Sequence, residues 1–335
     1  MLNKWLLLFN TVKYLKIGQI FNRIKRQIIK PRIDLSSAPE LAIFNDNISP
    51  VVLCSQKMYG SNDFKFLNKA YSLREEKDWN ATNQDKLWLY NLHYFDDLNA
   101  VNSHLRILWH NDLIQKWIDE NPPGFGNGWE PYPSSLRIVN WVKWLLLNNG
   151  LKKKWQDSLA AQIRFLSQNL EYHLLGNHLF VNAKALILAG LYFQGSEAYK
   201  WYQSGMEILN KELPEQVLSD GGNFELTPMY HAIFLEDLLD IINLHQLYKK
   251  KLPSDVTPKV LQMFKWLKAM CHPDGDIAFF NDTALGMAPN LSQLLDYAKR
   301  LKLHIVDDNN QITYLEESGY IRISKNDLVI IADVA

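Results

Sequence analysis

The chain has 335 residues, which fits about two domains, and its 47% hydrophobic and 21% charged residues exclude a disordered protein. Lys plus Arg and Asp plus Glu each number 36, and the resulting net charge of zero argues against a general nucleic-acid binder. The two cysteines, Cys54 and Cys271, provide no disulfide framework, and we expect both to be small buried residues.

The first 33 residues are basic and apolar, because they hold eight Lys or Arg residues and no acidic one. This pattern predicts an amphipathic basic helix over residues 8–28. It either docks on the protein body with its lysines in water or lies on an anionic membrane surface. The segment lacks a signal-peptide core and a cleavage site, so we expect a cytoplasmic chain, with a periplasmic or envelope-associated location left open.

From about residue 103 to 301 the apolar residues recur at helical spacing. Predicted helices cover 104–119, 134–148, 151–173, 177–193, 196–212, 227–249, 256–270 and 290–301. Three of the helix starts, at Ser134, Asn177 and Thr227, follow Gly- or Pro-rich loops and lie roughly 45 residues apart, with one further helix in each interval. This rhythm predicts a mainly α protein, an (α/α) toroid of helical hairpins whose inner helices begin on one rim. Ser134 or Ser135 should cap the second helix.

After about residue 310 the apolar spacing changes to that of strands, at 312–315, 319–324 and 328–332. Three strands do not form a stable sheet domain alone, so we interpret them as the first strands of a truncated β-sandwich. The predicted organisation is a basic helix and lead-in segment over 1–63, a toroid domain over 64–305, and the start of the sandwich over 306–335. Within the toroid we expect helices from about residue 65 to 301, with strands confined largely to the region after 310.

Two polar segments, residues 172–182 and 220–231, each open a presumed inner helix. Helix N-termini favour anions, so a rim of such ends suits a carboxylate or sulfate on a sugar. Each residue also has a simple structural explanation, such as Asn177 as an N-cap, Tyr230 as a core residue or Glu225 as a solvated turn residue. The sequence contains no glycine-rich phosphate-binding motif, and its histidines do not recur at the spacing of metal ligands. We therefore expect no cofactor and no metal.

These segments, together with Asn91-Leu92-His93-Tyr94-Phe95 and the stretch 129–137, Trp-Glu-Pro-Tyr-Pro-Ser-Ser-Leu-Arg, resemble the heparinase II/III-like polysaccharide lyases. Residues 12–23 are similar to members found beside capsule and O-antigen genes. The resemblance implies a heparin-sulfate lyase-type toroid followed by a β-sandwich. It also implies β-elimination on a uronate-containing anionic polysaccharide.

The resemblance further implies roles for individual residues. Asn177 would neutralise the uronate carboxylate, His178 would support it, and Tyr230 would act as base, acid or both. Substrate contacts are expected from Arg137, Trp129, Tyr132, Glu225, His231, Asn91 and Tyr94. Because the ordinary pKa of tyrosine is about 10, we expect positive potential from Arg137 and His231 to favour the tyrosinate.

The family's β-sandwich also supplies an active-site histidine in a G-H-x-H-type segment that this sequence does not contain. Activity would then need the missing sandwich, for instance as a separate chain. One alternative is a toroid glycoside hydrolase, whose two carboxylates would come from Asp220, Glu225 and Asp282. The other alternative is a catalytically inactive glycan-binding or envelope-associated fragment.

Overall fold

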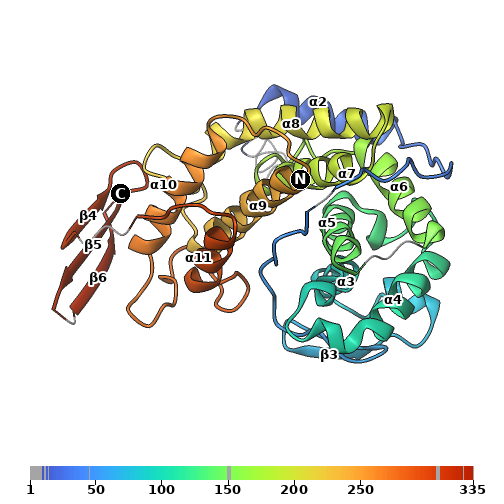
Figure 1. Ribbon diagram of the computed structural model, residues 1–335, viewed down its shortest axis with the longest axis horizontal. Helices are drawn as coiled ribbons and strands as arrows, with labels where there is room; N and C mark the ends of the chain where they lie inside the picture. Colours follow the sequence, from blue (N-terminus) through green and yellow to red (C-terminus); the bar gives the residue numbers. More distant parts are fainter. Residues whose placement is uncertain are drawn as a thin grey trace.

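The computed structural model describes residues 10, 13, 15–44, 46–148, 152–306, 310–326 and 328–334. Its helices follow one another in an open arc, with a three-stranded sheet at each end (Figure 1). None of the helices in these ranges is both long enough and apolar enough to cross a membrane.

Two series of helices build the arc. The inner series, α3 (Lys86–Tyr94), α5 (Pro131–Asn148), α7 (Gly176–Tyr192) and α9 (Pro228–Leu247), packs in that order. The outer series, α4 (Ile107–Glu120), α6 (Lys153–Ser167), α8 (Ser196–Gln216) and α10 (Val256–Ala269), packs against it, and α11 (Leu291–Arg300) contacts α9. Short 3-10 helices, η1 (Glu76–Asn80), η2 (Asp96–Asn99), η3 (Ser103–Arg106) and η4 (Asn127–Trp129), join these elements. The predicted toroid of helical hairpins is confirmed.

The inner helices are buried because apolar residues surround nearly their whole circumference. In α7 every residue from Leu179 to Ala189 is buried, and α9 is buried over most of its length. One apolar core runs through the arc, and a smaller cluster around Trp266 and Tyr320 joins α10 to the C-terminal sheet.

The C-terminal sheet contains β4 (Ile312–Leu315), β5 (Tyr320–Lys325) and β6 (Leu328–Asp333) in antiparallel order, which confirms the three predicted strands. The other sheet was not expected. It consists of the antiparallel strands β1 (Met58–Gly60), β2 (Asp63–Phe66) and β3 (Lys69–Ser72), and it crosses the predicted boundary between residues 63 and 64. The sequence 63–66 alternates polar and apolar residues, and the turn that follows uses left-handed backbone at residues 67 and 68.

The predicted cap at Ser134 or Ser135 is wrong, and the alternative interpretation of Asn177 as an N-cap is not observed. Helix α5 begins at Pro131, a residue suited to a first turn, so Ser134 and Ser135 lie inside the helix. Their hydroxyls donate to the carbonyl oxygens of Gly128 and Pro131, at 3.0 and 2.8 Å. Asn177 is the second residue of α7, which has no side-chain cap. The side-chain amide of Asn177 therefore does not cap α7 and can bind another partner.

The basic N-terminal helix is α2 (Ile17–Ile28), the second half of the predicted span 8–28. Most of the first half lies outside the described residues. The lead-in that follows is tied to the toroid, because the amide of Ala42 donates to the carbonyl oxygen of Tyr192 at 2.9 Å.

Candidate active site

The two polar segments meet where α7 and α9 begin. Leu175 and Gly176 have φ angles of 64° and 54°, a left-handed turn that directs the chain into α7. A Cβ atom added to Gly176 would lie 3.6 Å from Cζ of Phe224 and 3.7 Å from Oε1 of Glu225. The loop before α9 therefore lies directly against the first turn of α7.

Tyr132, at the start of α5, connects the side chains of this region. The Asn177 side chain lies near its hydroxyl, and its ring centroid lies 4.5 Å from that of His178 and 6.0 Å from that of Tyr94. Burial raises the pKa of Tyr132, and Tyr230 on α9 is close enough to contribute to the same shift. Four inner helices thus direct side chains toward one region.

His178 is held by a buried carboxylate. Its Nδ1 lies 3.2 Å from Oε1 of Glu171, whose backbone amide and second carboxylate oxygen are both bound by the Asn182 side chain, at 2.8 and 3.1 Å. Because a carboxylate oxygen only accepts, we assign the proton to Nδ1, which leaves Nε2 as the acceptor of the neutral ring. Glu171 directly precedes the polar segment 172–182 and was not among the predicted site residues.

Tyr230 lies on the more open side of α9. The half-buried positions near the start of this buried helix are Tyr230, Ile233 and Glu236, at a spacing of three residues. The pKa of Tyr230 is raised by burial and then by the carboxylates of Glu225 and Asp282. The expected positive potential around Tyr230 is therefore wrong, because its charged neighbours are acidic.

Glu225 itself shares this environment. Burial and the nearby Asp282 raise its pKa, and His178 acts in the opposite direction. Glu225 is half-buried and Asp282 is exposed. The site thus pairs a partly desolvated carboxyl with a solvated one.

Arg137 is a fully buried structural residue. Its guanidinium donates to Oε1 of Gln162 at 2.9 Å, to the carbonyl oxygen of His93 at 3.2 Å and to that of Gly128 at 2.7 Å. It also stacks over Trp117 at 3.9 Å. The expected contact with substrate does not fit this geometry, because the donors already fix α5 to α3, η4 and α6.

Trp129 and His231 are likewise buried in the fold. The Trp129 indole donates to the carbonyl oxygen of Asn121 at 3.3 Å. The His231 ring stacks on Trp266 at 4.4 Å, with Nδ1 accepting from the amide of Asn223 at 3.2 Å. Neither side chain forms a wall of the site. The sequence could not show this, because each has the residue type expected at a sugar site.

The C-terminal sheet braces the loop that precedes α9. Asp220 Oδ2 accepts from the amide and hydroxyl of Ser318 at 2.7 and 2.8 Å. The carbonyl oxygen of Leu226 accepts from Asn281 at 2.8 Å and from the Tyr320 hydroxyl at 3.0 Å. Asp220 is therefore committed to loop structure, which removes it from the three carboxylates considered for a hydrolase.

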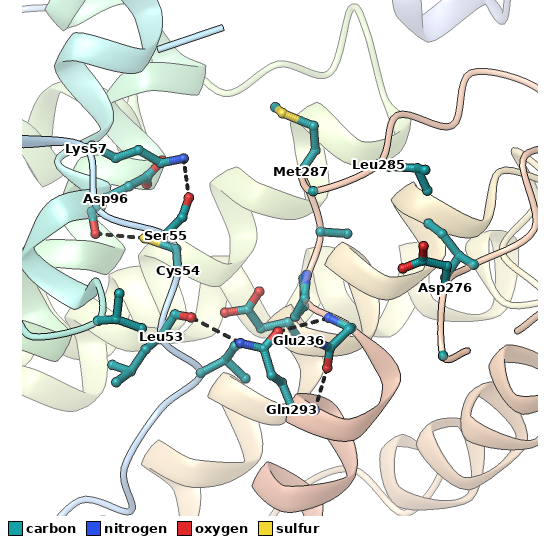
Figure 2. A pocket seen from close by; sticks show the side chains of 18 of the residues that line it. Leu53, Cys54, Ser55, Lys57, Asp96, Glu236, Asp276, Leu285, Met287 and Gln293 are labelled. Carbon is teal, nitrogen blue, oxygen red and sulfur yellow. Dashed lines mark hydrogen bonds between the residues drawn. The ribbon is translucent and has the colours of Figure 1, made fainter. Parts of the chain in front are cut away.

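A cavity of about 530 Å³ lies beside α9 (Figure 2). Glu236 lines it, six residues after Tyr230 and hence about 9 Å further along the helix axis. Lys57 and Asp96 lie on one side, and the loop with Leu285 and Met287 lies on the other. Of the predicted site residues, Asn91 lines this cavity. No cluster of three or more His, Cys, Asp or Glu side chains suited to a metal ion occurs in the described ranges.

The family model for the heparinase II/III N-terminus matches residues 21–314. The chain belongs to this family. It is 33% identical to a heparin-sulfate lyase of Bacteroides stercoris over 117 residues, which are 34% of this chain and 18% of that protein. It is 26% identical to the heparin-sulfate lyase of Bacteroides thetaiotaomicron over 229 residues, which are 62% of this chain and 32% of that protein.

Solved structures show the same fold. A heparinase III structure matches with a TM-score of 0.60 and 22% identity, over 78% of this chain and 48% of that one. The heparan sulfate lyase HepC from Pedobacter heparinus matches with a TM-score of 0.53 and 17% identity, over 93% and 55%. This member of the family thus spans about half the length of the solved relatives it matches.

In this family member a buried ion network lies behind the cavity and joins the inner helices. Lys184 of α7 contacts Asp237 and Asp240 of α9, both at 2.6 Å, and Lys143 of α5 contacts Asp240 at 3.0 Å. Tyr297 of α11 donates to Asp240 at 2.9 Å. The two lysines thus face three carboxylates, those of Asp237, Asp240 and Glu236. Burial raises the pKa of Glu236, and its acidic neighbours raise that pKa further.

Proposed function

We propose that the chain carries the toroid half of the active site of a polysaccharide lyase that cleaves a uronate-containing polysaccharide by β-elimination. The observation that carries the proposal is the gathering of Asn177, His178 and Tyr230 around Tyr132, from the first turns of α7 and α9. The heparin-sulfate lyases among the relatives support this class of reaction.

The reaction breaks the C5–H and C4–O4 bonds of the uronate and forms a C4=C5 double bond. One proton leaves C5 for a base, and another proton reaches the departing O4. Because negative charge builds on the carboxylate as the C5 proton leaves, a donor at the carboxylate lowers the barrier. Asn177 supplies that donor, since its amide is not used to cap α7.

The protonation pattern divides the two proton transfers. Tyr230 is a neutral phenol, because burial and two carboxylates raise its pKa, and this form can donate to O4. His178 has Nε2 available as an acceptor, because Glu171 binds Nδ1. We assign the O4 proton to Tyr230 and the removal of the C5 proton to His178.

The charges of the site favour a substrate of low sulfation. Glu225 and Asp282 both act on Tyr230, and a sulfate group beside them would be repelled. An unsulfated uronate polysaccharide places its one carboxylate at Asn177 and neutral hydroxyls elsewhere. We therefore expect such a polymer to be cleaved faster than heavily sulfated heparin.

A glycoside hydrolase is the second candidate, because Glu225 and Asp282 form a carboxyl pair with different environments. The raised pKa of Glu225 suits a general acid, and the solvent-exposed carboxyl of Asp282 suits the second role. The products distinguish the candidates, since a lyase leaves an unsaturated uronate that absorbs ultraviolet light and a hydrolase does not.

The experiment follows this absorbance during incubation with unsulfated and sulfated uronate polysaccharides. The chain is tested alone and with any polypeptide encoded directly downstream, because the match covers only about half of the solved relatives. Tyr230→Phe removes only the phenol oxygen, and the same change at exposed Tyr199 on α8 is the matched control. We expect Tyr230→Phe to reduce kcat by at least about 100-fold with little change in glycan binding.

Three other results would contradict parts of this proposal. Reducing ends without new absorbance would identify the hydrolase. Glycan binding without turnover under all conditions would identify an inactive binding module. Full activity in His178→Gln would assign both proton transfers to Tyr230.

A further inference from the structure

Helix α2 carries an apolar face that points away from the protein. Ile17, Phe21, Ile24 and Ile28 recur at the spacing that places them on one side of a helix. These four side chains are between 54% and 86% exposed, and no residue of α2 is buried.

The opposite, polar side of α2 contacts the toroid. Arg26 donates to Nε2 of His173 at 2.6 Å, and the Gln19 amide donates to the carbonyl oxygen of Leu174 at 3.4 Å. At about 100° per residue, these two side chains lie on the side of α2 opposite to Ile17. A surface helix normally buries its apolar face in the core, so α2 is turned the other way.

The position of α2 leaves this face accessible. Figure 1 shows α2 on the outer side of the arc, beside α8, and Lys16 contacts Glu215 of α8 at 2.8 Å. The sheets at the two ends of the arc lie elsewhere. The polar side of α2 contacts His173 and Leu174, which precede the site residue Asn177, so the apolar side faces away from the candidate active site.

Positive charge surrounds the apolar face. Arg23 and Lys25 lie on its two sides, Lys30 and Arg32 follow, and residues 1–33 contain no acidic residue. Exposed Ile29 and Ile33 extend the apolar surface. An apolar face bordered by Lys and Arg is the pattern of a helix that lies in the interface of an anionic bilayer.

We propose that α2 binds an anionic lipid bilayer, with Ile17, Phe21, Ile24 and Ile28 at the acyl boundary and Arg23 and Lys25 at the headgroups. An anionic polysaccharide would use the positive charges but leave the four apolar side chains in water. A second copy of the chain would bring two basic surfaces together. The bilayer satisfies both features, and the proposal does not depend on the lyase activity.

The test is flotation of the full chain with vesicles of phosphatidylcholine alone or with 30% phosphatidylglycerol. Phe21→Glu/Ile24→Glu places charge on the apolar face, and Leu105→Glu/Leu108→Glu makes the same change at two exposed leucines near the start of α4. Arg23→Gln/Lys25→Gln removes two charges, and Lys250→Gln/Lys251→Gln is its control. All these side chains are exposed, so each variant should retain the thermal unfolding midpoint of the parent.

We expect the parent and both controls to bind the anionic vesicles and to bind phosphatidylcholine much more weakly. The apolar-face variant and the charge variant should each lose at least about tenfold in partition coefficient. Absence of binding at low salt would overturn the proposal, as would equal loss in the Leu105/Leu108 control. Two further results would also overturn it. One is binding of Arg23 and Lys25 to a soluble polyanion but not to vesicles, and the other is self-association that Phe21→Glu/Ile24→Glu abolishes, in a parent that does not bind vesicles.

Discussion

Replacing Lys184 by Met tests the ion network that joins the inner helices. The lysine is 3% exposed and contacts Asp237 and Asp240, both at 2.6 Å. Met retains most of the length of the side chain and removes its charge. Asp240 then still has Lys143 and Tyr297, whereas Asp237 loses its contact to Lys184 and its Oδ2 has no partner within the described structure. The substitution thus leaves one buried carboxylate without compensation.

Breaking a buried ion pair from one side costs about 3 to 5 kcal/mol, which is a large share of the roughly 5 to 15 kcal/mol that stabilises a typical domain. The cost should depend on pH. Burial already raises the pKa of Asp237, and removing the lysine raises it further. When the pKa of an acid is higher in the folded than in the unfolded state, the protein loses stability as pH rises from the unfolded pKa to the folded one. The deficit should therefore be smallest near pH 5 and largest near pH 8.

Urea unfolding at pH 5 and pH 8 measures these changes in the free energy of unfolding. It is applied to the parent, Lys184→Met, Asp237→Asn and the double variant. The double variant should recover at least about 1 kcal/mol relative to Lys184→Met, because the uncompensated charge is gone. Lys200→Met, at an exposed lysine of α8, should change the free energy of unfolding by less than about 0.5 kcal/mol. A cost below about 1 kcal/mol for Lys184→Met, or no recovery in the double variant, would refute the reasoning.

Three further predictions concern stability. Burial would raise the pKa of Asp97, but hydrogen bonds from His110 and Arg106 outweigh it and hold this pKa at about 2. The protein should therefore lose about 2 kcal/mol of stability as the pH falls from about 4 to 2. Thermal melts of Asp97→Asn should lack this acid-dependent step. Gly176→Ala should cost about 1 kcal/mol in urea unfolding, because φ there is 54°; no loss would contradict the left-handed turn. Arg137→Met should lower the unfolding midpoint while leaving glycan affinity unchanged, and a selective loss of affinity would restore its role in substrate binding.

The periodicity of the sequence predicted the long elements and not the short ones. Helices α7 and α9 differ from their predicted spans by two residues or fewer at each end, because apolar residues dominate each of them. Strands β1 to β3 were missed because each has only three or four residues. Strands this short give too few residues to distinguish a period of two from one of 3.6.

The candidate site was predicted by residue type, and residue type does not reveal burial. Arg137 and His231 have the chemistry of substrate ligands, yet neighbours more than twenty residues away use their polar groups. Glu171 has no motif of its own, and its position against His178 depends on the loop between α6 and α7. Such pairings arise from tertiary packing, so a single sequence contains no local signal for them.

The bonds from the C-terminal sheet to the loop before α9 set an order of events during synthesis. Asp220 and Ser318 are 98 residues apart, and Leu226 and Tyr320 are 94 apart. At a translation rate of about 5 to 20 residues per second, the loop emerges from the ribosome roughly 5 to 20 s before the groups that fix it. The loop before α9 therefore remains incompletely braced in a nascent chain until Ser318 and Tyr320 have left the ribosome.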